Sequence, residues 1–275
     1  MLVGMYDKTT VSLAPQVLRS YVNQFEHIRN GLDSEIITKE FSIFDDPVNS
    51  AVREINQESP DLVGFSTYIW NIREIQEVVK QIGDTKIVLG GPQLTGIEKR
   101  IIDRNPKVDF VISGEGEIAF KELLEHFMGQ RRIDQVSGIT ARDGLQTPIG
   151  KPVNLDEIPK FYDRIFQENK DLSWINLETS RGCPFGCKFC TWGYDKKMRY
   201  FDVERVKKDL DEILEQDQIK SIYFCDSSLL LKKERAREIL KHIIKSGRKI
   251  SARYEFDVEY LDDETIELLA ELPDH

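Results

Sequence analysis

Residues 177–190 read Leu-Glu-Thr-Ser-Arg-Gly-Cys-Pro-Phe-Gly-Cys-Lys-Phe-Cys, which places Cys183, Cys187 and Cys190 within a span of eight residues. The proline and the glycine between the first two cysteines disfavour regular structure, so the three thiols lie on a loop. Thiolates are natural ligands of iron–sulfur clusters, and three on a short loop can bind three corners of a cubane cluster. The stretch therefore predicts a cluster with one iron left open.

Zinc is the alternative metal for this loop. A structural zinc site usually takes four ligands in two pairs, and the sequence near the loop supplies three. Cys225 is the fourth cysteine of the chain and would have to fold back from far downstream. Disulfide bonds between these four cysteines are a further alternative, which a reducing compartment would oppose. Cluster binding is the favoured interpretation, and three unrelated buried cysteines is the least favoured one.

The chain from residue 173 onward predicts strands and helices in alternation. The expected strands are 174–179, 219–225 and 250–256, and the expected helices are 203–215, 232–246 and 263–272. Such alternation is typical of (β/α) barrels, but three units cannot close a barrel of eight. We therefore expect a partial barrel whose chain is cut short.

The chain before residue 130 also alternates between apolar runs and amphipathic segments. The expected strands are 1–6, 35–43, 62–66, 86–89 and 108–112, and the expected helices are 15–25, 48–57, 72–82, 97–104 and 119–127. This pattern predicts an α/β fold with a doubly wound parallel sheet, covered by helices on both faces. Ligands of such sheets bind beyond the carboxyl ends of the strands.

Small and polar residues follow three consecutive strands of this expected sheet. They are Ser66, Thr67, Tyr68, Trp70 and Asn71 after the third strand, Gly90, Gly91, Pro92 and Gln93 after the fourth, and Gly114, Glu115 and Glu117 after the fifth. Glycine allows a ligand to approach the backbone closely. One such ending is more often only a turn, but three in succession favour a bound cofactor.

Two domains are expected from the length of 275 residues. A further strand is expected at 136–142, and Pro152 and Pro159 break regular structure after it. We predict a doubly wound domain over residues 1–145, a linker over 146–172 and the partial barrel over 173–275.

The composition argues against several classes of protein. A net charge of −10 disfavours general binding to nucleic acid, because such binding depends on Lys and Arg that neutralise phosphates. No apolar stretch approaches the roughly 20 residues that span a bilayer. The first residues lack the pattern of a secretory signal. We expect a cytoplasmic protein that binds neither membranes nor nucleic acid.

The cysteine spacing resembles that of a known family. Cys-x-x-x-Cys-x-aromatic-Cys, with Phe189 as the aromatic residue, is the signature of radical S-adenosylmethionine (SAM) enzymes. The flanking segments 177–183 and 197–201 are similar to the branch of that family with a cobalamin-binding domain in front. The resemblance extends to the endings Trp-Asn, Gly-Gly-Pro and Gly-Glu-Gly-Glu of the three upstream strands, and covers almost the whole chain.

The resemblance implies cofactors and roles for individual residues. Cys183, Cys187 and Cys190 would hold a [4Fe-4S] cluster whose open iron binds SAM, and reductive cleavage would give a 5'-deoxyadenosyl radical. Phe189 would lie near the adenine. Asp226 and Ser227 follow the second barrel strand, where polar groups would bind the methionine end of SAM. Asp226 would accept a charge-assisted hydrogen bond from the ammonium group.

Arg253 and Glu255 alternate along the third barrel strand, so both side chains are expected on the face that lines the barrel. Contact with SAM or substrate is one interpretation of this pair. An ion pair between the two side chains is almost equally favoured.

The first domain departs from the pattern of many cobalamin-binding relatives. These carry Asp-x-His-x-x-Gly, whose histidine binds cobalt, and none of His27, His126, His242 and His275 stands in that context. His27 and His126 are expected at helix ends as solvated or capping residues. The resemblance then implies either cobalamin without a histidine below cobalt or a domain that binds no cobalamin.

The reaction that the resemblance implies most often is methyl transfer to an unactivated carbon or phosphorus centre. Two alternatives stay open: a radical SAM protein without cobalamin, and a non-catalytic cofactor-binding module. A ferredoxin or flavodoxin is implied as the low-potential electron donor, under anaerobic conditions. The substrate is expected to be a small molecule or a peptide, of unassigned identity.

Overall fold

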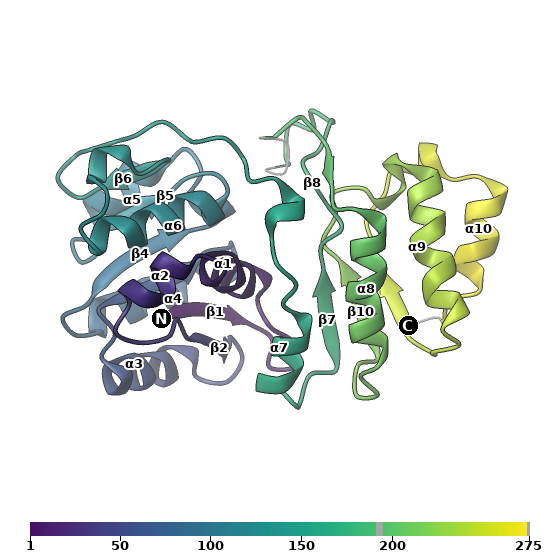
Figure 1. Cartoon of the computed structure of the whole chain (residues 1–275), viewed down its shortest axis with the longest axis horizontal. Helices are drawn as coiled ribbons and strands as arrows, with labels where there is room; N and C mark the ends of the chain where they lie inside the picture. The colour runs from purple at the N-terminus through teal and green to yellow at the C-terminus, as the bar shows by residue number, and fades with distance from the viewer. Residues whose placement is uncertain (191–194, 274–275) are drawn as a thin grey trace. The chain divides into compact units, whose positions relative to one another are not determined.

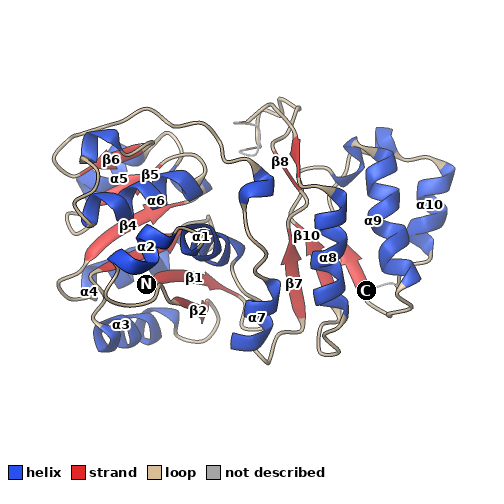
Figure 2. Ribbon diagram, in the orientation of Figure 1, coloured by secondary structure: helices blue, strands red, loops and turns tan. Residues whose placement is uncertain are grey.

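The computed structural model consists of two compact units, residues 1–159 and residues 160–275. The structure describes residues 1–190 and 195–273. Each unit has its own sheet and its own helices (Figures 1 and 2). Within the described ranges, no helix has the length and the apolar composition needed to cross a membrane.

Unit 1 is built on a six-stranded sheet with the order β2-β1-β3-β4-β5-β6. Its strands are β1 (Leu2–Tyr6), β2 (Thr38–Ser42), β3 (Leu62–Ser66), β4 (Lys86–Gly90), β5 (Phe110–Ile112) and β6 (Ile139–Ala141). The first five pair in parallel, which confirms the predicted α/β fold with a doubly wound sheet. The strand β6 pairs antiparallel with β5, so the sheet is mixed at that edge.

Helices cover both faces of this sheet. They are α1 (Leu13–Asn23), α2 (Glu26–Gly31), α3 (Pro47–Glu58), α4 (Ile72–Gln81), α5 (Glu98–Arg104) and α6 (Gly116–Phe127). Helices α3, α4 and α5 share one buried core with alternate strand residues such as Val63 and Phe65. Helices α1, α2 and α6 lie together on the other face (Figure 1). The short helix α2 was not predicted, because its six residues carry almost no apolar repeat.

The parallel register brings the predicted strand endings to one edge of the sheet. Ser66 at the end of β3 pairs with Gly90 at the end of β4, and Gly90 pairs with Ile112 at the end of β5. The residues that follow these three strands therefore leave the sheet side by side. This edge is where a doubly wound sheet binds its ligand.

Unit 2 contains a three-stranded parallel sheet with the order β11-β10-β7. The strands are β7 (Trp174–Leu177), β10 (Ser221–Phe224) and β11 (Ser251–Arg253), and the helices are α7 (Tyr162–Glu168), α8 (Val203–Leu214), α9 (Lys233–Lys245) and α10 (Asp263–Ala270). Helices α8, α9 and α10 stand in a row beside the strands (Figure 2). The three predicted strand–helix units are present, and the described residues form an open sheet and not a closed barrel.

A short antiparallel pair adds to this unit at the cysteine loop. Strand β8 (Ser180–Arg181) pairs with β9 (Arg199–Tyr200), which brings the two ends of the loop together. Single 3₁₀ turns occupy Pro92–Leu94, Ile133–Gln135, Leu155–Glu157, Leu229–Leu231 and Val258–Tyr260.

The region expected as a linker, residues 146–172, contains the helix α7. Its buried side chains Tyr162, Ile165 and Phe166 belong to unit 2, which begins at Lys160. The Tyr162 hydroxyl donates a hydrogen bond of 2.9 Å to the Asn176 carbonyl oxygen in β7. The helix is therefore part of the core of unit 2, although two prolines in the segment before it gave the signal of a linker.

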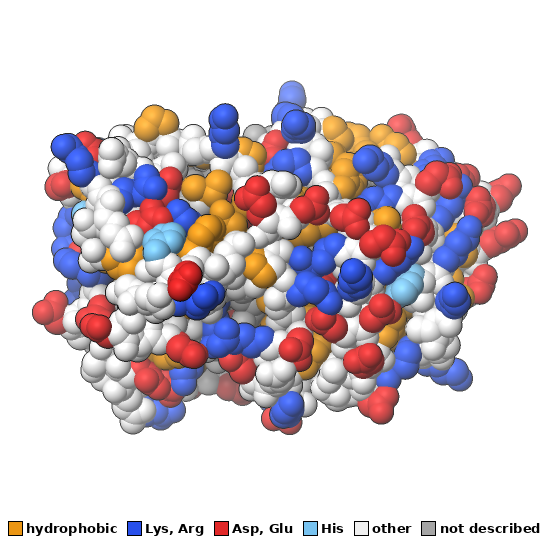
Figure 3. Space-filling model, in the orientation of Figure 1, with side chains coloured by type: hydrophobic (Ala, Val, Ile, Leu, Met, Phe, Trp, Pro, Cys, Tyr) orange, Lys and Arg blue, Asp and Glu red, His pale blue; other side chains and the backbone are white. Residues whose placement is uncertain are grey.

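Charged side chains of both signs are interspersed on the face seen in Figure 3. Among the described residues, oppositely charged side chains also form ion pairs across neighbouring turns, such as Lys207 with Glu204 on α8. Mixed charge of this kind is typical of a solvated surface.

Candidate cofactor sites

The cysteine loop leaves and re-enters unit 2 through the β8–β9 pair. Gly182, directly before the first cysteine, has φ of +93°, and a Cβ there would lie 2.3 Å from the Lys197 carbonyl oxygen. Only glycine fits that close approach without strain. The Cys183 amide donates to the Asp195 carbonyl oxygen at 2.9 Å, so the base of the loop is also closed by a backbone bond.

The three predicted cluster ligands differ in exposure. Cys183 is buried, Cys187 and Cys190 are exposed, and all three are free thiols. Three thiols on one loop fit the donor set of an iron–sulfur cluster, since each loses its proton on binding metal. In the arrangement of the described residues, no three His, Cys, Asp or Glu side chains converge closely enough to hold a metal ion.

Phe189 lies at the exposed tip of the loop, with 92% of its surface accessible. Arg253 at the end of β11 and Glu255 beyond it are also exposed, and Tyr254 between them is half-buried. The strand β11 ends at Arg253, so Glu255 lies outside it, and a common face of the two side chains that lines a barrel stays a prediction. The structure gives no ion pair between the Arg253 and Glu255 side chains, although both residues lie in the described range. A contact of Phe189, Arg253 or Glu255 with SAM stays a prediction.

Asp226 follows β10 and is buried, with 2% of its surface exposed. Its carboxylate accepts hydrogen bonds from the Thr179 amide at 3.3 Å, from the Thr179 hydroxyl at 2.9 Å and from the Ser180 hydroxyl. Burial raises the pKa of Asp226 to about 6, and these hydrogen bonds offset part of that rise. The carboxylate is therefore directed into the chain, whereas the sequence predicted a contact with the SAM ammonium group.

Ser227, the next residue, also bonds within the chain. Its hydroxyl donates to the Gly182 carbonyl oxygen at 2.6 Å, directly before the first cysteine. Both polar residues predicted to bind SAM after β10 thus contact the base of the cysteine loop.

Cys225 is a poor candidate for a fourth metal ligand. Its thiol lies 3.8 Å from the Asn176 amide oxygen, and burial raises the pKa of Cys225 well above its ordinary value, with the nearby carboxylates of Glu178 and Asp226 adding to the effect. A thiol held in its protonated form does not bind metal readily. This disfavours the zinc alternative.

The predicted edge of unit 1 carries aromatic side chains. The rings of Tyr68 and Trp70 stack with centroids 4.4 Å apart and an angle of 8° between them, and Tyr6 at the end of β1 lies 5.4 Å from Trp70. Trp70 and Ile69 are 43% and 77% exposed. An exposed aromatic and apolar surface beyond the strand ends fits the flat face of a large ring cofactor such as cobalamin.

Other predicted residues of this edge bond within the chain. Asn71 is buried, and its side-chain amide donates to the carbonyl oxygens of Met5 and Ser66 at 3.1 and 3.0 Å. Thr67 is buried as well, and its hydroxyl donates to the Gly90 carbonyl oxygen at 2.6 Å. These two side chains join the ends of β1, β3 and β4, so their direct role is in the shape of the edge.

The remaining predicted residues divide by exposure. Pro92 is exposed, Ser66, Gly90, Gly91, Gln93, Gly114 and Glu115 are half-buried, and Glu117 is buried in the first turn of α6. Gly114 has φ of +83°, which explains a glycine at that turn. Their contacts with a cofactor stay predictions.

Two family models match the chain, and they match separate segments. The B12 binding domain matches residues 26–124, and the Radical SAM superfamily matches residues 177–275. The chain belongs to the radical SAM proteins with a B12-binding domain. In this radical SAM protein the first match contains the three strand endings, and the second contains the cysteine loop.

Two curated relatives are similar to this radical SAM protein over most of its length. A 2-(S-pantetheinyl)-carbapenam-3-carboxylate methyltransferase from Streptantibioticus cattleyicolor is 29% identical over 249 residues, which are 82% of this chain and 35% of the relative. The cobalamin-dependent radical SAM methyltransferase TokK from Streptomyces tokunonensis is 27% identical over 251 residues, with the same two shares. The chain spans about a third of the length of these relatives.

A solved structure shares the fold of the chain. The cobalamin-dependent S-adenosylmethionine radical enzyme OxsB with aqua-cobalamin bound has a TM-score of 0.73 and 20% sequence identity, and the match covers 98% of this chain and 41% of OxsB. The likeness shows that both units have the arrangement of strands and helices found in that enzyme.

The histidines of the B12-binding unit lie in helices. The His27 ring bonds to a Glu125 carboxylate oxygen at 2.9 Å, and the His126 ring bonds to the Arg131 carbonyl oxygen at 3.0 Å. His242 pairs with Asp211 in unit 2, and His275 lies outside the described residues. Within residues 1–159, both histidines thus have partners, Glu125 on α6 and Arg131 in the turn after α6, and both lie near helix ends as predicted.

Sequence reasoning missed Arg235 of the radical SAM unit. Arg235 on α9 donates to the Thr179 hydroxyl at 3.0 Å, to the Thr179 carbonyl oxygen at 3.1 Å and to the Phe201 carbonyl oxygen at 2.9 Å. Its guanidinium also lies 5.4 Å from the centre of the Tyr200 ring. The signal was hidden because α9 is rich in basic residues, and only the fold shows which one faces the loop.

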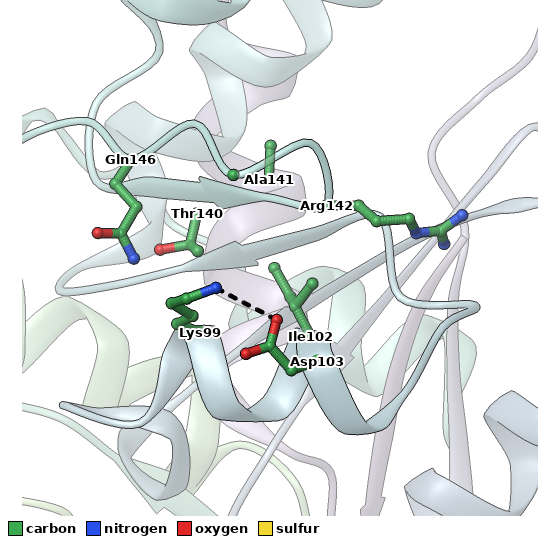
Figure 4. Close-up of a pocket in the computed structure, with 8 residues that line it drawn as sticks. Lys99, Ile102, Asp103, Thr140, Ala141, Arg142 and Gln146 are labelled. Carbon is green, nitrogen blue, oxygen red and sulfur yellow. Dashed lines mark hydrogen bonds and ion pairs between the residues drawn. The ribbon is translucent and has the colours of Figure 1, made fainter.

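A shallow depression in unit 1 lies away from the strand endings. Figure 4 shows it between α5 and β6, with Lys99 and Asp103 joined by an ion pair of 3.3 Å. Ala141 in its wall pairs with Phe110 at the beginning of β5. The depression is therefore at the opposite end of β5 from the predicted cofactor edge.

Proposed function

We propose that this protein is a cobalamin-dependent radical SAM methyltransferase. The observation that carries the proposal is the presence, in one chain, of a free three-cysteine loop and of a doubly wound unit with an aromatic edge beyond its strands. The matches to both family models and to two methyltransferases support it. Methyl transfer to an unactivated carbon or phosphorus centre is the reaction class we propose.

The residues of the chain bind and orient the groups that carry out this chemistry. With both groups bound, the cluster would supply the electron that cleaves SAM, and cobalamin would carry the methyl group. Cys187 and Cys190 present exposed thiols that a cluster can reach, and Cys183 presents one at the buried base of the loop. The Trp70 and Tyr68 rings offer an apolar surface for cobalamin.

Further parts of the proposal rest on the chemistry of an exposed cluster. Such a cluster needs a low-potential donor, and we propose ferredoxin or flavodoxin. Because oxygen attacks iron–sulfur clusters with an open iron, we propose that the protein works under anaerobic conditions in the cytoplasm. The proposed substrate is a small molecule or a peptide.

A radical SAM protein without cobalamin is the second candidate. Two observations favour it: the histidines of residues 1–159 bond to Glu125 and to the Arg131 carbonyl oxygen, and the Thr67 and Asn71 side chains bond to the backbone of neighbouring strands. Bound cobalt distinguishes the two candidates. A non-catalytic cofactor-binding module is the third, and reductive cleavage of SAM by the chain would rule it out.

The test is anaerobic reconstitution with iron, sulfide and hydroxocobalamin, followed by gel filtration and measurement of iron, sulfide and cobalt. We expect about four irons and about one cobalt per chain, and 5'-deoxyadenosine on addition of SAM and dithionite. The control is a Cys183→Ala, Cys187→Ala, Cys190→Ala triple variant, which should lose the iron. Iron without cobalt would reject methyl transfer by cobalamin in favour of the second candidate, and equal iron in the control would reject the cluster site.

A further inference from the structure

The point where β7 leads into the cysteine loop is joined to the end of β10. Thr179 and Ser180 both donate to the Asp226 carboxylate, and Ser227 donates to the Gly182 carbonyl oxygen. Thr179 is fully buried. Residues 226 and 227 thus contact the chain at Thr179, Ser180 and Gly182, the last of which directly precedes Cys183.

The same point is joined to α9 by Arg235. One guanidinium nitrogen donates to the Thr179 hydroxyl at 3.0 Å, and another donates to the carbonyl oxygens of Thr179 and Phe201 at 3.1 and 2.9 Å. Phe201 directly follows β9, and its amide donates back to the Thr179 carbonyl oxygen at 3.1 Å. Arg235 therefore binds both chain segments that enclose the cysteine loop.

The Thr179 hydroxyl links the Asp226 carboxylate to the Arg235 guanidinium. It donates its one proton to an Asp226 oxygen at 2.9 Å and accepts from Arg235 at 3.0 Å. These two directions are complementary for a hydroxyl group. Because hydrogen bonds to charged groups are stronger than neutral ones, loss of this one oxygen atom would remove the direct link between Asp226 and Arg235 and leave each of them bonded to the loop base only through its other contacts.

We propose that Asp226 and Arg235, acting through Thr179, are positioning residues that hold the base of the cysteine loop in place for cluster binding. The inference rests on the proposed function, because the role it assigns is to support binding of the iron–sulfur cluster that the proposed function requires. It replaces the predicted contact between Asp226 and SAM, since the carboxylate is buried and bonded within the chain. A fixed base reduces the conformational freedom that the loop loses when three thiolates bind one cluster.

Two cationic side chains close to the Tyr200 ring support the role of Arg235 in positioning the loop base. The Tyr200 ring, in β9, has Lys232 at 4.2 Å and Arg235 at 5.4 Å from its centre. Contacts between cations and aromatic rings stabilise the position of both partners. The second segment at the loop base is therefore held by its side chain as well as by its backbone.

The test compares Thr179→Val with Thr179→Ser in the full-length reconstituted protein. Valine keeps the shape but removes the hydroxyl, and serine retains it. We expect Thr179→Val to release iron to a chelator about 10-fold faster than the parent, and to change the electron paramagnetic resonance spectrum of the reduced cluster on addition of SAM. Thr179→Ser should behave like the parent. Asp226→Asn provides a second loss of the link if Thr179→Val does not fold.

The control for a purely structural effect is Arg237→Met on the same helix. Arg237 pairs with Asp262, Glu234 and Glu264 and faces α10, so its loss should lower the melting temperature without changing the iron release rate. Iron release and spectra equal to the parent in folded Thr179→Val or Asp226→Asn would overturn the inference. If the parent itself bound no iron, the proposed function would fail instead.

Discussion

Glu40, a buried carboxyl residue in unit 1, makes the stability of the protein depend on pH. It lies in β2 opposite Gly4 of β1, and a Cβ on Gly4 would be 2.1 Å from its carboxylate. Both carboxylate oxygens are shielded from water. Burial raises the pKa of Glu40 to about 8. The folded protein therefore keeps this carboxyl protonated at a pH at which the unfolded chain would release the proton.

We predict that Glu40→Gln weakens the pH dependence of stability. The folded state binds one more proton than the unfolded state between the ordinary value of 4.5 and about 8, so the free energy of unfolding falls as pH rises through that window. The fall is at most about 1.4 kcal/mol per pH unit. Glutamine is neutral throughout, so urea unfolding from pH 5 to 9 should show a flatter profile than the parent.

The exposed Glu26→Gln variant is the control for a general charge effect. It should follow the profile of the parent. Parallel profiles of the parent and Glu40→Gln would contradict a raised pKa at this site.

At the scale of elements, the end of β4 packs closely on the end of β3. The Thr67 amide donates to the Gly90 carbonyl oxygen at 2.7 Å. The next residue, Gly91, has φ of +114°, and a Cβ there would lie 2.4 Å from the Thr67 carbonyl oxygen. The second glycine of this ending, Gly91, is thus explained by its contact with Thr67, in addition to any close approach of a cofactor.

We predict that Gly91→Ala is more destabilising than Gly96→Ala. Both glycines have positive φ, but a Cβ at Gly96 would meet no atom within 4 Å. The positive φ at Gly96 should cost alanine about 1–2 kcal/mol, and Gly91, with φ of +114° and ψ of +167°, lies in a region essentially restricted to glycine that should cost alanine about 1–3 kcal/mol. The clash with Thr67 should add about 1–3 kcal/mol to the cost at Gly91. Free energies of unfolding in urea measure the difference, and equal values would show that the β3 end gives way.

At the scale of the whole molecule, the two family matches fall on separate compact units. The B12-binding match lies within residues 1–159, and the Radical SAM match lies within residues 160–275. The candidate ligands of each cofactor come from one unit only. We therefore expect that binding of one cofactor does not require ligands from the other unit.

We predict that cobalt and iron are lost independently. Trp70→Ala should weaken cobalamin binding about tenfold and leave iron content unchanged, because it removes part of the aromatic edge. The triple cysteine-to-alanine variant should lose iron and retain cobalamin. Phe127→Ala is the matched control, since Phe127 is 40% exposed on α6 and packs on Phe110 at the start of β5. Loss of both cofactors in either variant would show that the sites depend on each other.

The order of the elements and the type of chemistry at the cysteine loop could be predicted from the sequence alone. Apolar runs located every strand of the six-stranded and three-stranded sheets to within a few residues, most clearly where a buried parallel strand is almost continuously apolar, as in β3 and β4. The cysteine motif can be recognised without knowledge of the fold, since its three candidate ligands lie within eight residues of sequence. The short helix α2 and the helix α7 were missed because tertiary packing, and not a strong repeat, holds them.

The contacts of the polar residues at the strand ends depend on the folded arrangement of the chain. The sequence places Asp226, Asn71 and Thr67 after strands, where a ligand is expected, but does not say which way a side chain points. The fold turns all three inward, because buried backbone amides and carbonyls at these ends need hydrogen-bond partners. Arg235 reaches Thr179 across 56 residues of chain. Such a contact depends on the packing of α9 between α8 and α10, which no local pattern encodes.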